Sequence, residues 1–250
     1  MKVLITGASS GLGKEITIYL DNLGYETIIV SRDKKTLSDV KKQLKNNCKI
    51  IIKDLSNVNE AYELYDELKK ENIDFVVNNA GIGQYGEFIN TDINKDISMI
   101  NLNIISVNIL TKLFLKDMII KNKGRILNIS SLASFTPGPL MASYYATKAY
   151  VTNLTLAIHK ELKGKNSKVK ISCLCPGPID TNFNKELNIK FVIKSLSAKY
   201  VAKYTIDNCL KGKTIIIPGF KNKIARIFTK LLPLNILLDI NYNIQKKKEI

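Results

Sequence analysis

Seven short apolar runs, rich in β-branched residues, recur along the chain and are separated by segments with helical periodicity. We expect strands at 2–6, 26–30, 49–53, 74–78, 125–130, 169–175 and 214–218. We expect helices at 12–23, 34–46, 57–71, 94–122, 143–163 and 198–211. Because the apolar runs lack polar alternation, they suit parallel strands that are covered on both faces. The pattern therefore predicts an α/β fold with a doubly wound, mostly parallel seven-stranded sheet, which binds ligands at the carboxyl ends of its strands.

The net charge of the chain bears on its partners. A formal charge of +16 on 250 residues would attract nucleic acid or an anionic membrane. However, Arg32, Arg125 and Arg226 are the only arginines, so lysine supplies nearly all of the excess. Lysine lacks the planar fork that reads base edges. We therefore expect a solvated, lysine-rich surface on a single domain, and no nucleic-acid partner.

Cysteine and histidine are too sparse to predict a metal centre. Cys48, Cys173, Cys175 and Cys209 show no zinc-ligand spacing, and His159 is the one imidazole. Cys173 and Cys175 alternate along one predicted strand, so we expect both to be small buried residues. The first residues hold no signal-peptide core, and no segment matches an uninterrupted membrane span. The sequence therefore predicts a protein of the cytoplasm without a bound metal.

A glycine-rich turn follows the first predicted strand. Gly7, Gly11 and Gly13 lie in TGASSGLG (6–13), between that strand and a predicted helix. Glycines let the backbone approach a pyrophosphate, whose charge the helix N-terminus stabilises. The GxxxGxG spacing differs from the commoner GxGxxG. The turn predicts dinucleotide binding, with an ordinary strand-to-helix turn as the alternative.

The residues after the second predicted strand bear on the choice of cofactor. An acidic side chain there meets the ribose of NAD(H), whereas this chain has Ser31 and Arg32. Arg32 would form charge-assisted bonds to the extra phosphate of NADP(H), and the adjacent Asp33 would weaken that preference. We therefore expect NADP(H) in preference to NAD(H). An exposed arginine at the start of a helix is the alternative.

Tyr144 and Lys148 lie four residues apart in a predicted helix and therefore share one face. An isolated phenol ionises near pH ~10, but a neighbouring ammonium stabilises the phenolate and lowers this pKa. Proton transfer to and from a carbonyl oxygen then becomes feasible. Tyr145 competes for this role, but its spacing to Lys148 is less favourable. The pair predicts Tyr144 as the proton donor and acceptor.

These motifs stand in an order that resembles the classical short-chain dehydrogenases/reductases over roughly residues 2–218. KDLS (53–56) is similar to the family's adenine contact, and NNAG (78–81) to its motif after the fourth strand. NISS (128–131) is similar to the segment with the catalytic serine, and PGPIDT (176–181) to the segment that faces nicotinamide. The finer similarity is to bacterial members, loosely related to ketoacyl and hydroxysteroid reductases. The resemblance implies a Rossmann-like fold and an enzyme that interconverts a ketone and a secondary alcohol.

The resemblance also implies roles for single residues. Ser131 would hydrogen-bond the substrate oxygen, Tyr144 would exchange its proton, and hydride would pass between nicotinamide and the carbonyl carbon. Lys148 would lower the pKa of Tyr144 and hold the nicotinamide ribose. Asn103 would open the long helix to seat a water that links Lys148 to solvent. Considered alone, Ser131 fits a strand-end turn, and Asn103 fits a helix-breaking polar residue. The implied cofactor contacts are Gly7, Ser9, Ser10, Gly11, Leu12, Gly13, Arg32, Asp54, Leu55, Asn79, Ala80, Gly81, Tyr144, Lys148, Pro176, Gly177, Ile179 and Thr181.

The loops expected above the site carry mostly apolar side chains. Candidate substrate contacts are Tyr85, Phe135, Met141 and Phe183. They favour a lipophilic ketone or alcohol, such as an acyl chain or a steroid-like ring. We expect a small-molecule carbonyl or alcohol as substrate. We also expect a homodimer or homotetramer, because members of the family commonly pair through their long helices.

The C-terminal tail differs from the rest of the chain. Residues 220–245 mix apolar and basic positions at roughly helical spacing, with a break at Pro233. We expect a dehydrogenase domain over 1–219 and a basic amphipathic extension over 220–250, packed on or beside it. A helical cap is the plainer interpretation of the extension, and a weak contact with a membrane surface is the alternative.

Two other functions compete with a simple reductase. One is a membrane-surface-associated lipid carbonyl reductase, recruited by the tail. The other is a regulator that senses NADP without turnover. The presence of Ser131, Tyr144 and Lys148 together argues against a regulator, because sensing alone does not require them.

Overall fold

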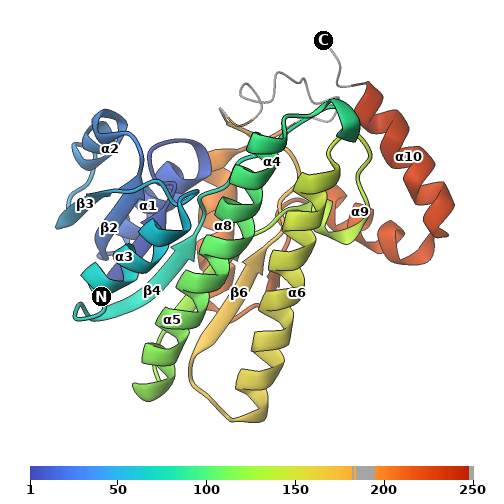
Figure 1. The fold of residues 1–250 in the computed structure, drawn as a ribbon. Coiled ribbons are helices and arrows are strands. Elements are labelled where there is room, and N and C mark those ends of the chain that lie inside the picture. The colour runs from blue at the N-terminus through green and yellow to red at the C-terminus, as the bar shows by residue number, and fades with distance from the viewer. Residues whose placement is uncertain (182, 184–194, 248–250) are drawn as a thin grey trace.

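The computed structural model describes residues 1–181, 183 and 195–247. Its main sheet has seven strands in the order β3-β2-β1-β4-β5-β6-β9, and each neighbouring pair is parallel (Figure 1). The strands are β1 (Lys2–Thr6), β2 (Glu26–Ser31), β3 (Cys48–Ile52), β4 (Ile73–Asn78), β5 (Arg125–Ile129), β6 (Lys170–Leu174) and β9 (Ile215–Ile216). A second, two-stranded sheet pairs β7 (Ile179–Asp180) with β8 (Leu196–Ser197). The predicted doubly wound sheet is confirmed.

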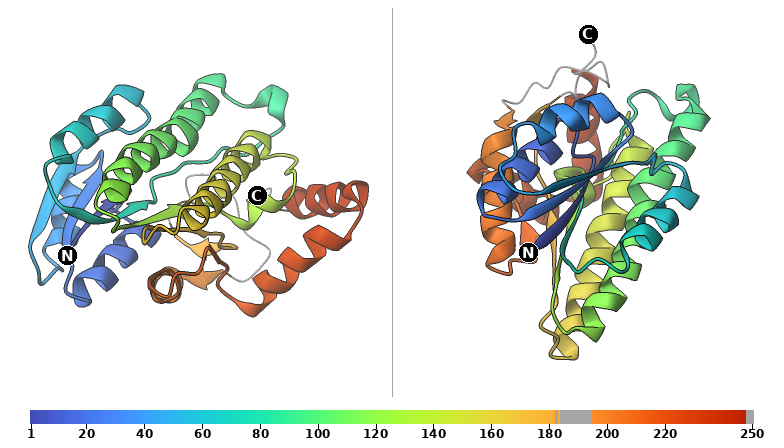
Figure 2. Two further views of the ribbon diagram at one scale, coloured as in Figure 1. Left: turned by 90° about the horizontal axis from the view of Figure 1, so that it is seen from below. Right: turned by 90° about the vertical axis from the view of Figure 1, so that its left-hand side faces the viewer.

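Helices cover both faces of the main sheet (Figure 2). Residues of β1 explain why the predicted strands lack polar alternation. Val3 and Ile5 pack into the core on one face, Leu4 packs into the core on the other, and all three are fully buried. The helices on the first face are α1 (Gly11–Asn22), α2 (Lys34–Lys41) and α8 (Ala198–Leu210). Those on the second are α3 (Val58–Leu68), α5 (Val107–Ile120) and α6 (Ala142–Gly164).

The long helix predicted over 94–122 is interrupted. It begins as α4 (Ile93–Ile100), widens into a π-helical segment, η2 (Asn101–Ser106), and continues as α5. Local π-helical turns occur frequently at functional sites. This one contains Asn103, so the prediction that Asn103 opens the helix agrees with the backbone.

By length and composition, the run Ile93–Ile120 could cross a membrane, and it is the one helix of this kind among the described residues. Half of its most apolar stretch is buried inside the fold, as in the core helix of a globular domain. The run is therefore weak evidence for a membrane span.

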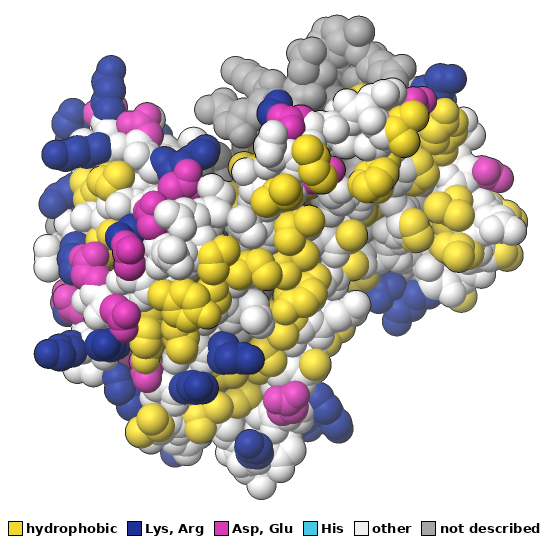
Figure 3. Space-filling model, viewed as in Figure 1, with side chains coloured by type: hydrophobic (Ala, Val, Ile, Leu, Met, Phe, Trp, Pro, Cys, Tyr) yellow, Lys and Arg dark blue, Asp and Glu magenta, His cyan; other side chains and the backbone are white. Residues whose placement is uncertain are grey.

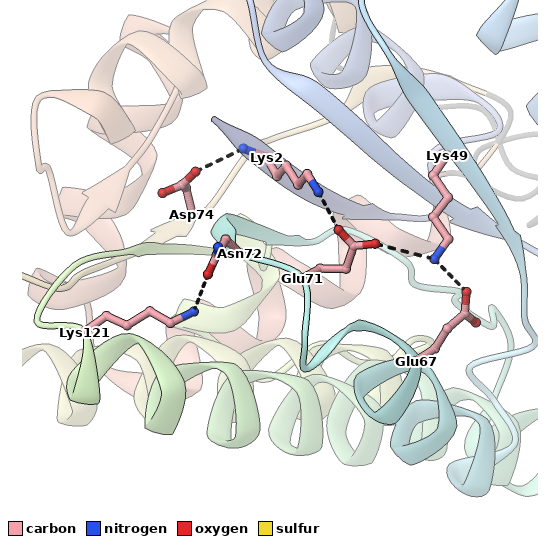
Figure 4. Close-up of polar contacts among 7 residues, drawn as sticks. All are labelled: Lys2, Lys49, Glu67, Glu71, Asn72, Asp74 and Lys121. Atoms are coloured by element: carbon pink, nitrogen blue, oxygen red, sulfur yellow. Dashed lines mark hydrogen bonds and ion pairs between the residues drawn. The ribbon is translucent and has the colours of Figure 1, made fainter.

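A group of ion pairs lies at the amino ends of the strands (Figure 4). Glu71 accepts from Lys2 and lies 4.0 Å from Lys49, which also pairs with Glu67 at 3.0 Å. The main-chain N–H of Lys2 donates to Asp74 at 3.1 Å. These side chains are partly exposed, so each pair adds little stability. They therefore lie away from the carboxyl ends of the strands. Ligands are expected at the carboxyl ends.

The C-terminal residues form two helices, α9 (Phe220–Leu231) and α10 (Leu234–Lys246), separated at Pro233 as the sequence predicts. We refer to them as the C-terminal helix pair. Figures 1 and 2 show the pair at one end of the molecule, beyond the upper end of α6. The pair is tied to the loop after η3 (Leu132–Phe135), because Asn241 donates to the Thr136 hydroxyl at 2.7 Å and to the Pro137 carbonyl at 2.9 Å.

Candidate active site

The carboxyl ends of β1 and β4 meet where the strand order reverses, and the loops that follow them touch. The Thr6 hydroxyl accepts from the main-chain N–H groups of Asn79 and Ala80, each at 3.0 Å. A Cβ on Gly7 would lie 2.8 Å from the Cα of Ala80, and Gly7 has a φ of +64°. Only glycine suits both the close approach and the backbone angle. The crevice of a doubly wound sheet opens at this position.

Helix α1 begins in this crevice without a side-chain cap. Ser10 precedes the helix in an extended conformation and its side chain makes no capping hydrogen bond. A Cβ on Gly13 would lie 2.1 Å from the main-chain oxygen of Gly7, so the loop and the helix are pressed together. The first N–H groups of a helix have no intrahelical partner, and the residues that carry them here line the cavity. This arrangement fits the pyrophosphate of a dinucleotide.

Arg32 lies at the rim of the same cavity. Its guanidinium is 3.9 Å from the carboxylate of Asp54, and its side chain is 69% exposed. The neighbouring Asp33 carboxylate accepts from the main-chain N–H groups of Lys35 and Thr36, at 2.8 and 3.3 Å. Asp33 therefore caps α2, and its charge is engaged at that helix N-terminus.

Helix α6 directs Tyr144 and Lys148 to the cavity. The ammonium of Lys148 donates to the main-chain oxygen of Ile129 at 3.1 Å and lies 5.7 Å from the centre of the Tyr144 ring. Burial lowers the pKa of Lys148 to about 8, and the nearby thiols of Cys173 and Cys175 oppose this shift. Lys148 is therefore a buried cation that is bonded to the protein on one side and open to the cavity on the other.

The predicted fall in the pKa of Tyr144 is not found, and the direction is reversed. Burial raises the pKa of Tyr144 to about 12, a hydrogen bond with Ser131 opposes the rise, and Tyr145 adds to it. Desolvation of the phenol is the largest cause of the shift, so the pKa rises even though the Lys148 ammonium lies 5.7 Å from the ring centre. In this structure the phenol keeps its proton at neutral pH.

Ser131 stands at the end of β5, where it caps η3. Its hydroxyl oxygen accepts the main-chain N–H of Ala133 at 3.1 Å. This bond uses a lone pair and leaves the hydroxyl hydrogen for another acceptor. Ser131 therefore satisfies both interpretations, since it forms a strand-end turn and it can still donate into the cavity toward Tyr144 or a substrate oxygen.

Asn103 lies behind the cavity wall and joins three segments. Its amide exchanges hydrogen bonds with the main chain of Ile82, at 2.9 and 3.1 Å, and donates to the Thr147 hydroxyl at 3.1 Å. A Cβ on Gly81 would lie 3.1 Å from the Asn103 amide oxygen and 3.2 Å from the Lys148 ammonium. Asn103, Gly81 and Lys148 therefore lie close together.

One cavity of about 460 Å³ collects most of the predicted site residues. Every residue predicted to contact the cofactor lines it, as do Ser131, Met141 and Phe183. Tyr85 and Phe135 do not line it. Tyr85 packs behind Met141 and donates to the Gln245 carbonyl at 2.9 Å, whereas the Phe135 ring lies 3.8 Å beneath the guanidinium of Arg226. Both side chains support the C-terminal helix pair instead of lining the cavity. Most of the loop over 181–196 lies outside the described residues.

The C-terminal helix pair supplies cavity residues that sequence reasoning missed. They are Ala225, Thr229, Asn241, Ile244 and Gln245. Gln245 is buried, and its amide nitrogen donates to the hydroxyl of Tyr145, which also lines the cavity. The amide oxygen of Gln245 is buried without a hydrogen-bond partner. No local motif marks these positions, because Gln245 and Tyr145 are 100 residues apart in sequence.

Cys173 and Cys175 are fully buried in the core, as predicted, with their sulfur atoms 3.8 Å apart. Within residues 1–181, 183 and 195–247, no cluster of three or more His, Cys, Asp or Glu side chains is placed to hold a metal ion.

Comparison with known proteins places this geometry in a family. The family model described as short chain dehydrogenase matches residues 1–190. The chain is 33% identical over 187 residues to 3-oxoacyl-(acyl-carrier-protein) reductase of Rickettsia prowazekii, which covers 75% of this chain and 76% of that protein. It is 34% identical over 194 residues to very-long-chain 3-oxoacyl-CoA reductase of Anas platyrhynchos, which covers 73% of this chain. The match spans 61% of the length of the duck protein, so a substantial part of that protein lies outside the match.

A solved structure agrees with the fold. The short-chain dehydrogenase of Sphingobium yanoikuyae in complex with NADPH superposes with a TM-score of 0.81 over 88% of both chains. Its sequence identity to this chain is 24%, so the likeness supports the architecture and no finer property.

Proposed function

The chain belongs to the short-chain dehydrogenase family, and from this premise we propose that it is an NADP(H)-preferring oxidoreductase that interconverts a ketone and a secondary alcohol. The observation that carries the proposal is the convergence of Ser131, Tyr144 and Lys148 on the cavity that the glycine loop also lines. A cavity built for cofactor sensing alone would not need a buried phenol and a buried ammonium, since both are costly to desolvate.

Tyr144 is suited to deliver a proton to a ketone oxygen. Because its pKa is raised to about 12, the phenol is protonated across the physiological range. The Ser131 hydroxyl donates a second hydrogen bond to the same substrate oxygen. The bound nicotinamide cofactor supplies the hydride for reduction and accepts it for oxidation. The direction then follows the cofactor ratio and the supply of substrate.

Lys148 stabilises the charge that forms when the phenol gives up its proton. Its pKa of about 8 leaves the ammonium mostly protonated at neutral pH, 5.7 Å from the Tyr144 ring centre. In a buried site such a charge acts more strongly than in water, so it favours the developing phenolate. Asn103 lies near Lys148, across Gly81, and its own hydrogen bonds go to Ile82 and Thr147.

The preference for NADP(H) is supported by Arg32. This residue is the cation at the end of β2 that borders the cavity, where the extra phosphate of NADP(H) is expected. Asp33 is engaged with the N-terminus of α2, so it does not present a free carboxylate to the ribose. The partial pairing of Arg32 with Asp54 at 3.9 Å leaves the guanidinium able to bind phosphate.

A lipophilic substrate is supported by the lining of the cavity. Leu132, Met141, Phe183 and Ile244 line the same cavity as Tyr144. Large apolar linings with few polar groups are typical of sites for lipophilic ligands. The names of the matched reductases denote 3-oxoacyl substrates, so 3-oxoacyl thioesters are the first class to test.

Gln245 adds a polar contact for the substrate. Its buried amide oxygen has no partner among the residues that the structure describes, which makes its burial costly unless a ligand supplies a donor. A substrate with a hydroxyl or N–H group remote from its carbonyl would satisfy this oxygen. We therefore expect hydroxylated lipophilic carbonyls to be favoured over plain ones.

Two copies of the chain are proposed to pair through α4 and α5. Ile93, Ile97 and Ile100 are exposed at helical spacing on α4, and Figure 3 shows a continuous band of hydrophobic side chains over these helices. An apolar band of this kind is typical of an interface. Light scattering should report a dimer or tetramer, and Ile97→Asp should lower the mass. A wild-type monomer would contradict the pairing.

The test of the catalytic proposal is oxidation of NADPH and NADH against a panel of carbonyls. The panel should contain 3-oxoacyl thioesters, steroid ketones, hydroxylated ketones and small sugars. Turnover of the lipophilic carbonyls, with higher kcat/KM for NADPH, is the expected result. Turnover restricted to small polar sugars would contradict the substrate class, and cofactor binding without turnover on any member would favour a regulator.

A further inference from the structure

Helix α9 presents its apolar side to solvent. Phe220, Ile224, Ile227, Phe228 and Leu231 follow one face at helical spacing, and all five are exposed. Phe220 and Leu231 are 77% and 72% exposed. An amphipathic helix of a globular protein ordinarily turns such a face toward the core. On α9 the apolar face instead points toward solvent.

The orientation is fixed by contacts on the other side of α9. The Arg226 guanidinium lies 3.8 Å from the centre of the Phe135 ring, and the Asn222 amide donates to the Pro218 carbonyl at 2.7 Å. The Lys223 ammonium lies over the Tyr204 ring of α8, 5.7 Å from its centre. Polar and cationic side chains thus attach the helix to the domain, and its apolar face is left free.

Helix α10 adds further exposed apolar residues at the same end of the molecule. Leu237, Asn241 and Gln245 form its inner side, where Leu237 and Gln245 are buried. Its exposed side mixes polar residues, Asn235, Asp239, Asn243 and Lys246, with apolar ones, and Figure 3 shows hydrophobic side chains gathered over this helix at the right-hand end. The exposed apolar residues of α10 are Leu234, Ile236, Ile240, Tyr242 and Ile244.

The charge around this surface has one sign. The sequence 220–247 contains five lysines and Arg226, and its one acidic residue is Asp239. Lys221, Lys223 and Lys230 are exposed on α9 beside the apolar face. An exposed apolar face flanked by lysines is the pattern of a helix that lies in the interface of an anionic bilayer. A protein partner would call for a more mixed pattern of charges than a uniformly basic rim.

The surface also borders the mouth of the cavity. Ala225 on α9 and Ile244 on α10 line the cavity and are exposed to solvent as well. A ligand that leaves a bilayer beneath the two helices would therefore meet apolar side chains from the surface to the cavity. The exposed surface of the C-terminal helix pair therefore adjoins the cavity that holds the catalytic residues.

We propose that the C-terminal helix pair binds the surface of an anionic lipid bilayer, with the apolar face of α9 inserted among the headgroups. The cavity mouth then opens against the membrane. Entry of a lipophilic substrate from the bilayer rests on the proposed function, whereas membrane binding itself does not.

The test is co-sedimentation of the full chain with vesicles. One set contains phosphatidylcholine alone, and the other contains phosphatidylcholine with one third phosphatidylglycerol. The wild type should bind the anionic vesicles at least tenfold more tightly than the neutral ones, and high salt should reduce this binding. Leu231→Asp and Phe228→Asp should each lower binding at least tenfold, because they place a charge in the inserted face.

Matched variants separate this surface from other exposed features. Leu23→Asp changes a leucine that is 45% exposed just after α1, away from both the C-terminal helix pair and the proposed pairing helices, and it should bind vesicles like the wild type. The double change Lys221→Gln and Lys230→Gln should strongly reduce the preference for anionic vesicles, and it spares Lys223, which contacts Tyr204. Equal unfolding midpoints would show that each variant folds. Tyr144→Phe should bind vesicles normally, so the loss of turnover in that variant leaves the membrane proposal unaffected.

Three outcomes would overturn the proposal. The first is an absence of wild-type binding to anionic vesicles. The second is binding that Leu231→Asp and Leu23→Asp weaken to the same extent. The third is a drop in the oligomer mass of Leu231→Asp in light scattering, which would show that a second copy covers the face.

Discussion

The ammonium of Lys148 lies 5.7 Å from the centre of the Tyr144 ring, and its hydrogen bond goes to the main-chain oxygen of Ile129. Burial shifts the pKa of both groups. It raises the pKa of Tyr144 to about 12 and lowers that of Lys148 to about 8. Each shift favours the neutral form of its group. When the phenol loses its proton, the pair becomes an ion pair in a buried site, and each charge stabilises the other.

Removal of the Tyr144 hydroxyl tests its role as the proton donor. We expect Tyr144→Phe to lower kcat by roughly 10²–10⁴-fold, because general acid catalysis contributes a factor of this size. Its affinity for NADPH, measured by fluorescence titration, should stay within about threefold of the wild type, since the glycine loop is untouched. Tyr145→Phe is the matched control and should keep most of the activity, because the Tyr145 hydroxyl bonds to Gln245. Equal losses in the two variants would remove the distinction between the tyrosines.

Burial of Lys148 should make stability depend on pH. The pKa of Lys148 is lowered from 10.5 to about 8 in the folded protein, so the unfolded chain binds more protons between these two values. The contribution of Lys148 to stability therefore rises with pH across this window, and below pH ~8 the buried charge exerts its full destabilising effect. We expect Lys148→Met to be more stable than the wild type at neutral pH, by roughly 1–3 kcal/mol. The difference should shrink as the pH rises toward 10.5.

Urea unfolding of both proteins at several pH values measures this effect. Lys163→Met provides the control, because Lys163 is exposed near the end of the same helix. This variant should show a small difference from the wild type that is independent of pH. If Lys148→Met is less stable than the wild type throughout, the Lys148 bond to Ile129 outweighs the desolvation of the ammonium.

Arg32 should set the cofactor preference. A hydrogen bond to a charged group contributes about 1.5–3 kcal/mol. Because Arg32 is exposed, we expect its bond to the phosphate to contribute an amount at the lower end of this range. We expect Arg32→Asp to lower kcat/KM for NADPH at least tenfold and to leave that for NADH equal or higher. Lys41→Asp makes the same charge change at an exposed position at the far end of α2 and should have little effect. A preserved preference for NADPH in Arg32→Asp would show that another cation reads the phosphate.

The sequence predicts the sheet because its strands are buried on both faces, as Val3, Leu4 and Ile5 show. It also predicts which residues gather at the crevice, because the loops after β1 and β4 come together at the reversal of strand order. In both cases the prediction rests on patterns of neighbouring residues. The fold class then determines which of these segments meet in space.

Other properties depend on contacts that the sequence does not encode locally. The pKa of Tyr144 follows its burial, which depends on the segments packed around it. Phe135 was predicted to contact substrate because it is aromatic and near the site, but Arg226, from the tail, lies over its ring. Gln245 shows no signal at all in sequence, since its role arises when α10 packs against Tyr145.

The close contact between the glycine loop and α1 predicts a strong effect of one methyl group. Gly13→Ala would place a Cβ 2.1 Å from the Gly7 main-chain oxygen, so the loop must move. We expect at least a tenfold loss of NADPH affinity and a lower unfolding midpoint. At Gly164, in the last turn of α6, a Cβ would meet nothing within 4 Å. Gly164→Ala should therefore raise stability by about 0.5–1 kcal/mol. Unchanged cofactor affinity in Gly13→Ala would mean that the loop relaxes without cost.

Gln245 should discriminate between substrates that differ in one donor group. In Gln245→Met the amide is replaced by a side chain of similar length, so the unpaired oxygen is lost together with the bond to the Tyr145 hydroxyl, a loss that both test substrates share. We expect KM to rise about tenfold for a hydroxylated carbonyl whose donor reaches Gln245, since one hydrogen bond contributes about 1–1.5 kcal/mol. KM for the matching carbonyl without the hydroxyl should not change. Tyr85→Phe removes a bond to the Gln245 main chain and spares the amide, so it should leave the ratio of the two KM values unaltered. A parallel rise for both substrates in Gln245→Met would instead show that Gln245 positions α10 and does not contact the ligand.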